Sequence, residues 1–285
     1  MYHCEDSIID EINKCLVDKR NVSIIADVIS ILDDFFMYFF RFPLFNSGSK
    51  FKLLRNDQLV EVLSKKLRKV FIAANSYNIV SDKHSDNLNA ADVVRKFFKD
   101  FPGVCRMVMG DIKVLFQHDP SACSVAEVVL CYPAVKAIYI YRISHLLFEL
   151  NVPIVPRITS EVAHTLTGID IHPGARIGRD FFIDHGTGTV IGGTCIIGDN
   201  VKLFHNVTLG ALNPLDYVGC KNNRKRHPTI EDDVVIYSGA TILGGDTVIG
   251  YGSVIASNAF ITKSVLPNTK VMIKGHVGEV ITKSV

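Results

Sequence analysis

Between residues 171 and 261 a small aliphatic residue recurs at about every sixth position. The spacing slips to eight residues once and to seven once, and one longer segment interrupts it. A six-residue period fits neither a helix nor plain strand alternation, and it is typical of a parallel β-helix in which each hexad supplies one short strand and one turn. The pattern therefore predicts a narrow prism whose interior is filled by Ile171, Ile177, Ile183, Ile191, Ile197, Leu203, Leu209, Ile230, Ile236, Ile242, Ile249, Ile255 and Ile261.

The first part of the chain follows a different pattern, in which apolar residues recur three and four positions apart. This spacing is typical of helices with one buried face. Ser124 and Glu127 form a capping box that marks one helix start. We place a domain boundary near residue 166, which gives a helical domain over 1–166 and a β-helix domain over 167–285. The expected helices cover roughly 4–17, 21–40, 56–78, 89–99, 103–116, 124–130, 134–150 and 156–166.

Composition excludes several classes of protein. The net charge is only +2, so no nucleic-acid surface is expected. No run of about 18 uncharged apolar residues is present, so no membrane span is expected. The seven cysteines form no CxxC pair, and the N-terminus lacks the basic start and apolar run of a signal peptide. We therefore expect free thiols and a cytoplasmic location.

The segment 211–226 interrupts the six-residue pattern. It is polar, turn-rich and basic, and the pattern resumes directly after it. We interpret it as a loop that leaves one corner of the prism without breaking the coil. Loops on rigid scaffolds often carry functional residues.

Three polar clusters stand out in the otherwise apolar repeat: Asp170-Ile171-His172, Asp184-His185 and Arg226-His227. Asp170 and His185 are separated by nearly one triangular coil, and stacked coils lie about 4.8 Å apart. The carboxylate could therefore hold one ring nitrogen of His185 protonated and leave the other as a base. The alternative is a turn histidine with a structural role.

Metal binding is the rival use of histidines on a prism of this kind. The candidates are His172, His185, His205 and His227, and no two of them have the spacing of a paired ligand motif. We therefore expect no metal site.

The series DIHPGARIG, FIDHGTGTVIG, VTLGAL and RHPTI resembles the serine O-acetyltransferases, which are hexapeptide-repeat acyltransferases. The stretches at His118–Ala122 and Tyr141–His145 are also similar. The resemblance implies an α+β fold: an N-terminal all-helical domain followed by a C-terminal left-handed parallel β-helix of hexapeptide repeats.

The resemblance also implies the reaction. Acetyl would pass directly from acetyl-CoA to the hydroxyl of L-serine, with His185 as general base and Asp170 orienting it. Two carboxylates would bind the substrate ammonium and a guanidinium its carboxylate, in a pocket formed by Asp119, Asp184, Arg226 and His227. No tightly bound cofactor is implied. Acetyl-CoA, as co-substrate, would run past small corner residues at Gly210-Ala211, Ser238 and Ser257-Asn258.

Partners follow from the same resemblance. A site between prisms needs a homotrimer, and the helical half often joins two trimers into a hexamer. Many relatives dock a terminal isoleucine into O-acetylserine sulfhydrylase. This sequence ends in Val285, which would bury about 0.8 kcal/mol less, so the complex is not predicted. L-cysteine would compete with serine, because its ammonium and carboxylate groups are the same.

Two alternatives stay open at this point. The chain could acetylate another small acceptor, such as homoserine or an amino sugar. It could also be a catalytically silent scaffold that binds a partner enzyme.

Overall fold

The computed structural model describes residues 20–40, 56–75, 89–213, 224–274 and 279–284. The chain divides into two compact units, Met1–Asn87 and Leu88–Val285. The first contains α2 (Arg20–Phe40) and α3 (Asn56–Asn75). These helices contact each other, and their buried side chains include Phe35, Phe36, Leu63 and Leu67. The expected helix over 4–17 lies outside the described residues.

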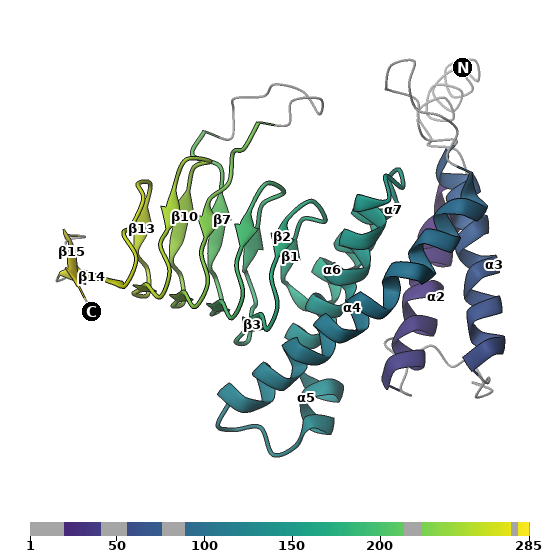
Figure 1. Cartoon of the computed structure of the whole chain (residues 1–285), viewed down its shortest axis with the longest axis horizontal. Coiled ribbons are helices and arrows are strands. Elements are labelled where there is room, and N and C mark those ends of the chain that lie inside the picture. The colour runs from purple at the N-terminus through teal and green to yellow at the C-terminus, as the bar shows by residue number, and fades with distance from the viewer. Residues whose placement is uncertain (1–19, 41–55, 76–88, 214–223, 275–278, 285) are drawn as a thin grey trace, which may run out of the picture. The chain divides into compact units, whose positions relative to one another are not determined.

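The second unit begins with four helices and continues as short strands (Figure 1). The expected helices from residue 124 onward agree with the structure to within about a residue at either end, and Ser124 caps the first of them by accepting the N–H of Glu127. The helices are α4 (Ala90–His118), α5 (Val125–Cys131), α6 (Pro133–Glu149) and α7 (Val155–Thr167).

Helix α4 runs without a break through Pro102, where two separate helices were expected. A proline inside a helix removes one backbone hydrogen bond. Here the apolar face continues on both sides of it, with Phe97, Phe101 and Val104 all buried. Phe97 and Phe101 also stack at 5.3 Å between ring centroids. Burial of this continuous stripe outweighs the lost hydrogen bond.

Each predicted hexad forms one short strand, and every one of the thirteen aliphatic residues is buried, so this prediction is confirmed. Two longer strands follow, β14 (Thr269–Lys274) and β15 (Glu279–Ser284). The hexad strands are β1 (Asp170–Ile171), β2 (Arg176–Ile177), β3 (Phe182–Ile183), β4 (Val190–Ile191), β5 (Ile196–Ile197), β6 (Lys202–Leu203), β7 (Thr208–Gly210), β8 (Thr229–Ile230), β9 (Val235–Ile236), β10 (Thr241–Leu243), β11 (Val248–Ile249), β12 (Val254–Ile255) and β13 (Phe260–Ile261).

The strands form three sheets that the chain visits in rotation. Sheet 1 has the order β1-β4-β7-β10-β13, sheet 2 β11-β8-β5-β2 and sheet 3 β15-β14-β12-β9-β6-β3. All pairs are parallel except β14 with β15. The chain therefore winds around a three-sided prism, and Figure 1 shows its coils side by side. We call the turns from sheet 3 to sheet 1 the leading corner, and those from sheet 1 to sheet 2 the trailing corner.

The interruption predicted at 211–226 lies at the trailing corner, between β7 and β8. Residues 214–223 are outside the described part of the chain. Across the gap β8 pairs in parallel with β5, with Ile196 opposite Thr229. The coil continues past the inserted segment, as expected.

Helix gives way to strand between Thr167 and Asp170, through Gly168 in a left-handed conformation. The boundary between the two compact units lies earlier, between Asn87 and Leu88, so α4 to α7 belong to the same unit as the strands. A division of the chain into functional domains near residue 166 stays a prediction.

Helix α6 covers the open end of the prism. Strand β2 is an edge strand, and the carbonyl groups at that edge need donors. The Tyr141 hydroxyl donates to Ala175 O at 2.6 Å, and Arg142 donates to Ile177 O and Gly178 O, also at 2.6 Å.

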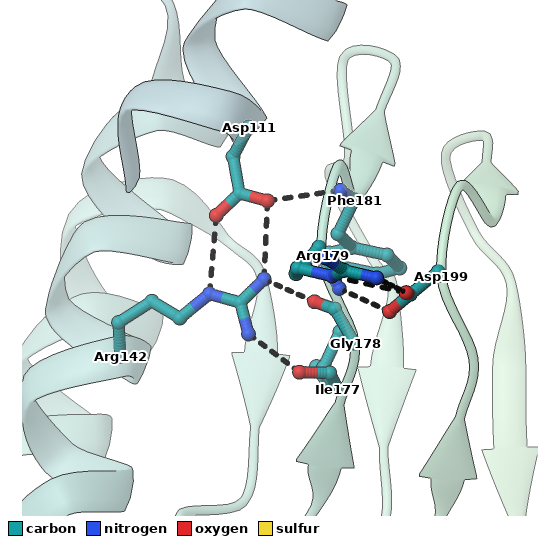
Figure 2. A network of polar contacts seen from close by, with 7 residues as sticks. All are labelled: Asp111, Arg142, Ile177, Gly178, Arg179, Phe181 and Asp199. Carbon is teal, nitrogen blue, oxygen red and sulfur yellow. Dashed lines mark hydrogen bonds and ion pairs between the residues drawn. The ribbon is translucent and has the colours of Figure 1, made fainter. Parts of the chain in front are cut away.

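A buried ion pair holds this arrangement together (Figure 2). Arg142 meets Asp111 of α4 through two hydrogen bonds of 3.0 and 3.1 Å, and both side chains are almost fully buried. Asp111 also accepts the backbone N–H of Phe181 at 2.9 Å. The pair thus satisfies donors and acceptors of the first coil and fixes α4 and α6 against it.

No helix among the described residues combines the length and apolar character that a membrane span requires. The four cysteines in the described part of the chain are free thiols: Cys105, Cys123, Cys131 and Cys195.

Candidate functional site

His185 occupies a strained turn at the leading corner, between β3 and β4. Its φ is +56°, in the left-handed region that only a small fraction of non-glycine residues adopt, with asparagine, aspartate and histidine the commonest. The N–H of Gly186 donates to Asp184 O at 2.6 Å and closes the turn around it. The side chain of His185 is 74% exposed, so it is presented to solvent rather than packed. Strain of this kind at a polar, exposed residue points to a functional role.

The glycine after His185 is required by space. Its φ is +82°, and an added Cβ would lie 2.4 Å from Cδ1 of Ile169 and 2.7 Å from Cγ2 of Ile183. Any larger residue at Gly186 would therefore push against the buried interior of the first coil.

Two carboxylates lie near His185. Asp184 Oδ1 is 3.6 Å from His185 Nε2. Asp119 follows α4, and its Oδ1 accepts the N–H and the hydroxyl of Ser121 at 2.8 and 2.6 Å, while its Oδ2 accepts the hydroxyl of Tyr132. These hydrogen bonds, the Ser121 hydroxyl first, lower the pKa of Asp119, and His185 acts in the same direction. Asp119 therefore stays an anion beside His185.

His205 lies on the next coil of the same corner. Its ring centroid is 6.0 Å from that of His185. Its Nδ1 is buried and has no hydrogen-bond partner among the described residues. The leading corner thus groups an exposed imidazole, a second imidazole with a spare ring nitrogen, and two carboxylates.

The trailing corner carries cationic and imidazole groups. Arg226 is exposed and His227 is buried beside it. Burial lowers the pKa of His227 to about 4, and Arg226, His172 and Lys225 contribute in the same direction. Burial also lowers the pKa of His172, as do the nearby Arg157 and Arg226, while Asp170 opposes the shift.

The predicted residues therefore fall into two groups at opposite edges of sheet 1. Asp119, Asp184 and His185 lie at the leading corner, and Arg226 and His227 at the trailing corner. The residues expected to line the acetyl-CoA path divide in the same way, since Ser238 and Ser257-Asn258 are in turns of the leading corner, whereas Gly210 and Ala211 are at the trailing corner.

The structure does not pair Asp170 with His185 in an ion pair within one chain; for His185, the ion pair described is with Asp184. The reason is the register of the first coil, in which Asp170 is opposite Val190. The turn after β3 is longer than those after β1 and β2, so His185 lies in the corner, five residues before Val190. Asp170 itself begins β1 and is half-buried.

The sequence alone did not point to Ser121 and Tyr132, the two hydroxyl donors to Asp119. Ser121 is in the stretch that resembled a known family, and its spacing of two from an aspartate is the signal of a local Asx-type turn. Tyr132 lies beyond α5 and no local pattern connects it to Asp119. The four histidines considered as metal ligands divide between the two corners, and no cluster of three ligand residues occurs in the described ranges.

Known proteins similar to this chain include several serine acetyltransferases. The serine acetyltransferase of Mycobacterium tuberculosis is 42% identical over 175 residues, which cover 61% of this chain and 72% of the relative. The crystal structure of Entamoeba histolytica serine acetyltransferase 1 in complex with L-cysteine superposes with a TM-score of 0.72 at 30% identity, over 88% of this chain and 97% of the other. The chain belongs to the serine acetyltransferase family.

A further family member, a plasmid-encoded serine acetyltransferase of Synechococcus elongatus, is 49% identical over 179 residues. The match covers 62% of this chain and 56% of that relative, so the chain spans little more than half the length of this serine acetyltransferase. No protein-family model matches the sequence.

Proposed function

We propose that the chain is a serine O-acetyltransferase, which transfers acetyl from acetyl-CoA to the hydroxyl of L-serine and yields O-acetyl-L-serine for cysteine biosynthesis. The observation that carries the proposal is the pair of carboxylates, Asp119 and Asp184, beside the exposed imidazole of His185. A zwitterionic amino acid needs anions for its ammonium and a cation for its carboxylate. Asp119 and Asp184 supply the anions beside His185, and Arg226 supplies an exposed cation.

In the proposed mechanism His185 is the general base. It removes the hydroxyl proton as the serine oxygen attacks the thioester carbonyl. The new C–O bond forms, the C–S bond breaks, and the CoA thiolate leaves and is protonated. The thioester is already activated, so direct transfer between two bound substrates suffices, and their positioning supplies much of the rate.

We further propose that the complete site forms between two copies of the chain. Within one chain sheet 1 separates the two groups, and His205 Nδ1 is buried without a partner among the described residues. A second prism that places its trailing corner against the leading corner would bring Arg226, His227 and Asp170 to His185. Asp170 of one copy would then orient His185 of its neighbour.

A contact between two different surfaces can close as a ring in which each copy uses each surface once. The resemblance implies that three copies close this ring as a homotrimer. A dimer of trimers through the helices is the other assembly that the resemblance implies. Acetyl-CoA would lie along the same contact, with Gly210 and Ala211 from one copy and Ser238 and Ser257 from the next. The Ser238 and Ser257 hydroxyls are 3.5 Å apart on successive coils, so they line a continuous edge.

Two further properties belong to the proposal. The coil is left-handed, as the resemblance to the serine O-acetyltransferases implies. The location is cytoplasmic, which is supported by the free thiols of the described cysteines. A crystal structure would test the hand of the coil. Cell fractionation would test the cytoplasmic location of the protein. Docking of the C-terminus into O-acetylserine sulfhydrylase is not proposed, and Val285 lies outside the described residues.

The test is release of free CoA thiol from acetyl-CoA with L-serine, L-homoserine and glucosamine as separate acceptors. We expect release with serine, and a fall of about 100-fold to 10,000-fold in His185→Ala, the range for loss of a general base. Faster release with homoserine or glucosamine than with serine would show that the faster acceptor, and not serine, is the substrate. No release with any acceptor would leave a scaffold role and contradict the proposal.

L-Cysteine should compete at the same pocket. It keeps the ammonium and carboxylate groups of serine and replaces the hydroxyl by a thiol. We expect L-cysteine to inhibit competitively with L-serine. Binding of L-cysteine that does not displace L-serine would contradict a shared site. A solved structure of the Entamoeba histolytica enzyme in this family contains L-cysteine.

A further inference from the structure

Thr194, in the trailing corner after β4, stands at the centre of a group of short hydrogen bonds. Its hydroxyl oxygen accepts the backbone N–H groups of Arg226 at 2.9 Å and His227 at 3.0 Å. The same oxygen lies 2.7 Å from Nδ1 of His227. The backbone N–H of Thr194 donates to that Nδ1 at 3.1 Å.

The donors and acceptors in this group can be assigned without ambiguity. A hydroxyl has one proton and two lone pairs. Backbone N–H groups can only donate, so those of Arg226 and His227 occupy both lone pairs of Thr194 Oγ1. The hydroxyl proton is then left for Nδ1 of His227, whose single lone pair is shared between this hydroxyl and the N–H of Thr194. A ring nitrogen that accepts cannot carry a proton, so the proton of the imidazole is on Nε2.

We propose that Thr194 is a positioning residue that holds His227 as the neutral imidazole with its proton on Nε2 and fixes Arg226 and His227 side by side. In this state His227 donates a hydrogen bond to an anionic oxygen of the substrates and does not act as a base. The identity of that oxygen rests on the proposed function, since it is either the serine carboxylate or the oxygen of the acetyl carbonyl in the transition state.

The surroundings of His227 favour the neutral ring. Burial holds its pKa at about 4, and Arg226, His172 and Lys225 act in the same direction. Lys225 also donates to the backbone carbonyls of Thr194, at 3.0 Å, and of His227. A positive charge on the ring would face the cations of Arg226 and Lys225, so the ring stays uncharged at neutral pH.

The ring also packs closely on the backbone of Gly192. A Cβ added at Gly192 would lie 2.0 Å from Cδ2 and 2.3 Å from Nε2 of His227. The imidazole is therefore held between Thr194 on its Nδ1 side and the backbone of Gly192 on the other. The backbone N–H of Arg226 donates to the same hydroxyl, so Thr194 also fixes the position of the Arg226 backbone.

The first measurement needs no variant of Thr194. Long-range ¹H–¹⁵N spectra of the histidine-labelled full chain report which ring nitrogen carries the proton, and His227→Asn assigns the signal. We expect Nε2–H for His227 at pH 7 and no protonation of the ring down to about pH 5. A protonated Nδ1 would overturn the proposal, whatever the enzyme acetylates.

The second measurement compares Thr194→Val, which lacks the hydroxyl at nearly the same shape, with Thr194→Ser, which keeps it. We expect the valine variant to show a mixture of tautomers, a higher pKa of His227, and kcat/KM for serine lower by about 10-fold to 100-fold. The serine variant should stay within about threefold of wild type. A rise in KM identifies the carboxylate as the partner oxygen, and a fall in kcat identifies the carbonyl oxygen.

Unchanged spectra and kinetics in Thr194→Val would overturn the role of Thr194, provided that thermal unfolding shows the variant to be folded. Failure of the proposed function is a separate result, because a wild-type chain inactive on every acceptor would still report its tautomer.

Discussion

Asp119 and His185 show how single residues acquire chemical character from their neighbours. Asp119 is at the end of a helix, a place where an aspartate is unremarkable, yet three hydrogen bonds from Ser121 and Tyr132 keep it ionised. His185 is in a conformation that costs free energy, and this cost is retained because the turn presents its ring at the surface.

Removing the Tyr132 hydroxyl should weaken substrate binding more than the chemical step. Tyr132→Phe takes one hydrogen bond from Asp119 and so raises its pKa. We expect KM for L-serine to rise by about threefold to tenfold with kcat nearly unchanged, measured by initial rates at pH 7. Tyr251→Phe is a matched control. Tyr251 lies in the turn from sheet 2 to sheet 3, between β11 and β12, and this turn belongs to neither the leading nor the trailing corner. An equal effect in both variants would contradict a specific role for Tyr132.

The depressed pKa of His227 has a consequence for stability. Between pH 6.5 and about 4 the unfolded chain binds a proton on this histidine that the folded chain does not. The free energy of unfolding should therefore be fully retained above pH 6.5 and should fall as the pH decreases toward 4. Urea unfolding at pH 7, 6 and 5 should show a smaller loss in His227→Asn than in wild type. Equal losses would show that this imidazole protonates freely in the folded chain.

At the scale of secondary-structure elements, α6 and the first coil depend on each other. The first coil has no preceding coil to pair with, and the buried Arg142–Asp111 pair replaces the missing partners (Figure 2). Arg179 and Asp199 form a second ion pair on the neighbouring turns, but Arg179 is 73% exposed. The two pairs are of the same chemical type and differ mainly in burial.

Breaking the buried pair should destabilise the second unit strongly. Arg142→Met leaves Asp111 as an unpaired buried charge, at a cost of about 3–5 kcal/mol. Arg179→Gln, the exposed control, should cost far less, because solvent screens an exposed ion pair. Thermal unfolding followed by circular dichroism measures both changes, and similar values for the two variants would contradict the role assigned to burial.

A double variant separates the charge from the backbone contacts. Arg142→Met combined with Asp111→Leu removes both charges and leaves no unpaired ion. We expect it to remain destabilised, because Ile177 O, Gly178 O and Phe181 N would still lose their partners. Full recovery of stability would mean that the backbone groups find other partners.

The elements that could be predicted from the sequence are those whose period is set by local geometry. The hexads gave every short strand and its buried residue, because each one repeats the same turn. The break expected at Pro102 did not occur, because packing across α4 is a tertiary effect. The stacking of His185 could not be derived from an average coil length, since one longer turn shifts the register so that Val190 rather than His185 is opposite Asp170.

At the scale of the whole molecule, the division of the site between two edges of sheet 1 explains why one chain alone would be incomplete. Asp184 and His185 belong to the leading corner, and Arg226 and His227 to the trailing corner. In the proposed shared site a neighbouring copy takes part in the chemistry, so assembly and activity should be lost together.

Complementation between two inactive variants tests this directly. His185→Ala and Arg226→Ala each remove one half of every site. When the two are co-expressed or refolded together, a mixed trimer contains a contact at which the intact corner of one copy meets the intact corner of the other. We expect activity to return in the mixture and not in either variant alone. Light scattering of the wild type should give a trimer or hexamer, and an active monomer would contradict the shared site.

The last strand pair limits how far the prism can grow. Strand β14 continues sheet 3 in parallel, but β15 then runs antiparallel beside it and forms the terminal edge of that sheet. A ladder of parallel strands is a template on which identical segments can add without limit, as they do in amyloid fibrils. By reversing direction at its final rung, the chain presents an edge with the wrong polarity for the next parallel strand. Sheet 3 therefore ends in an edge that does not continue the parallel ladder of the coil.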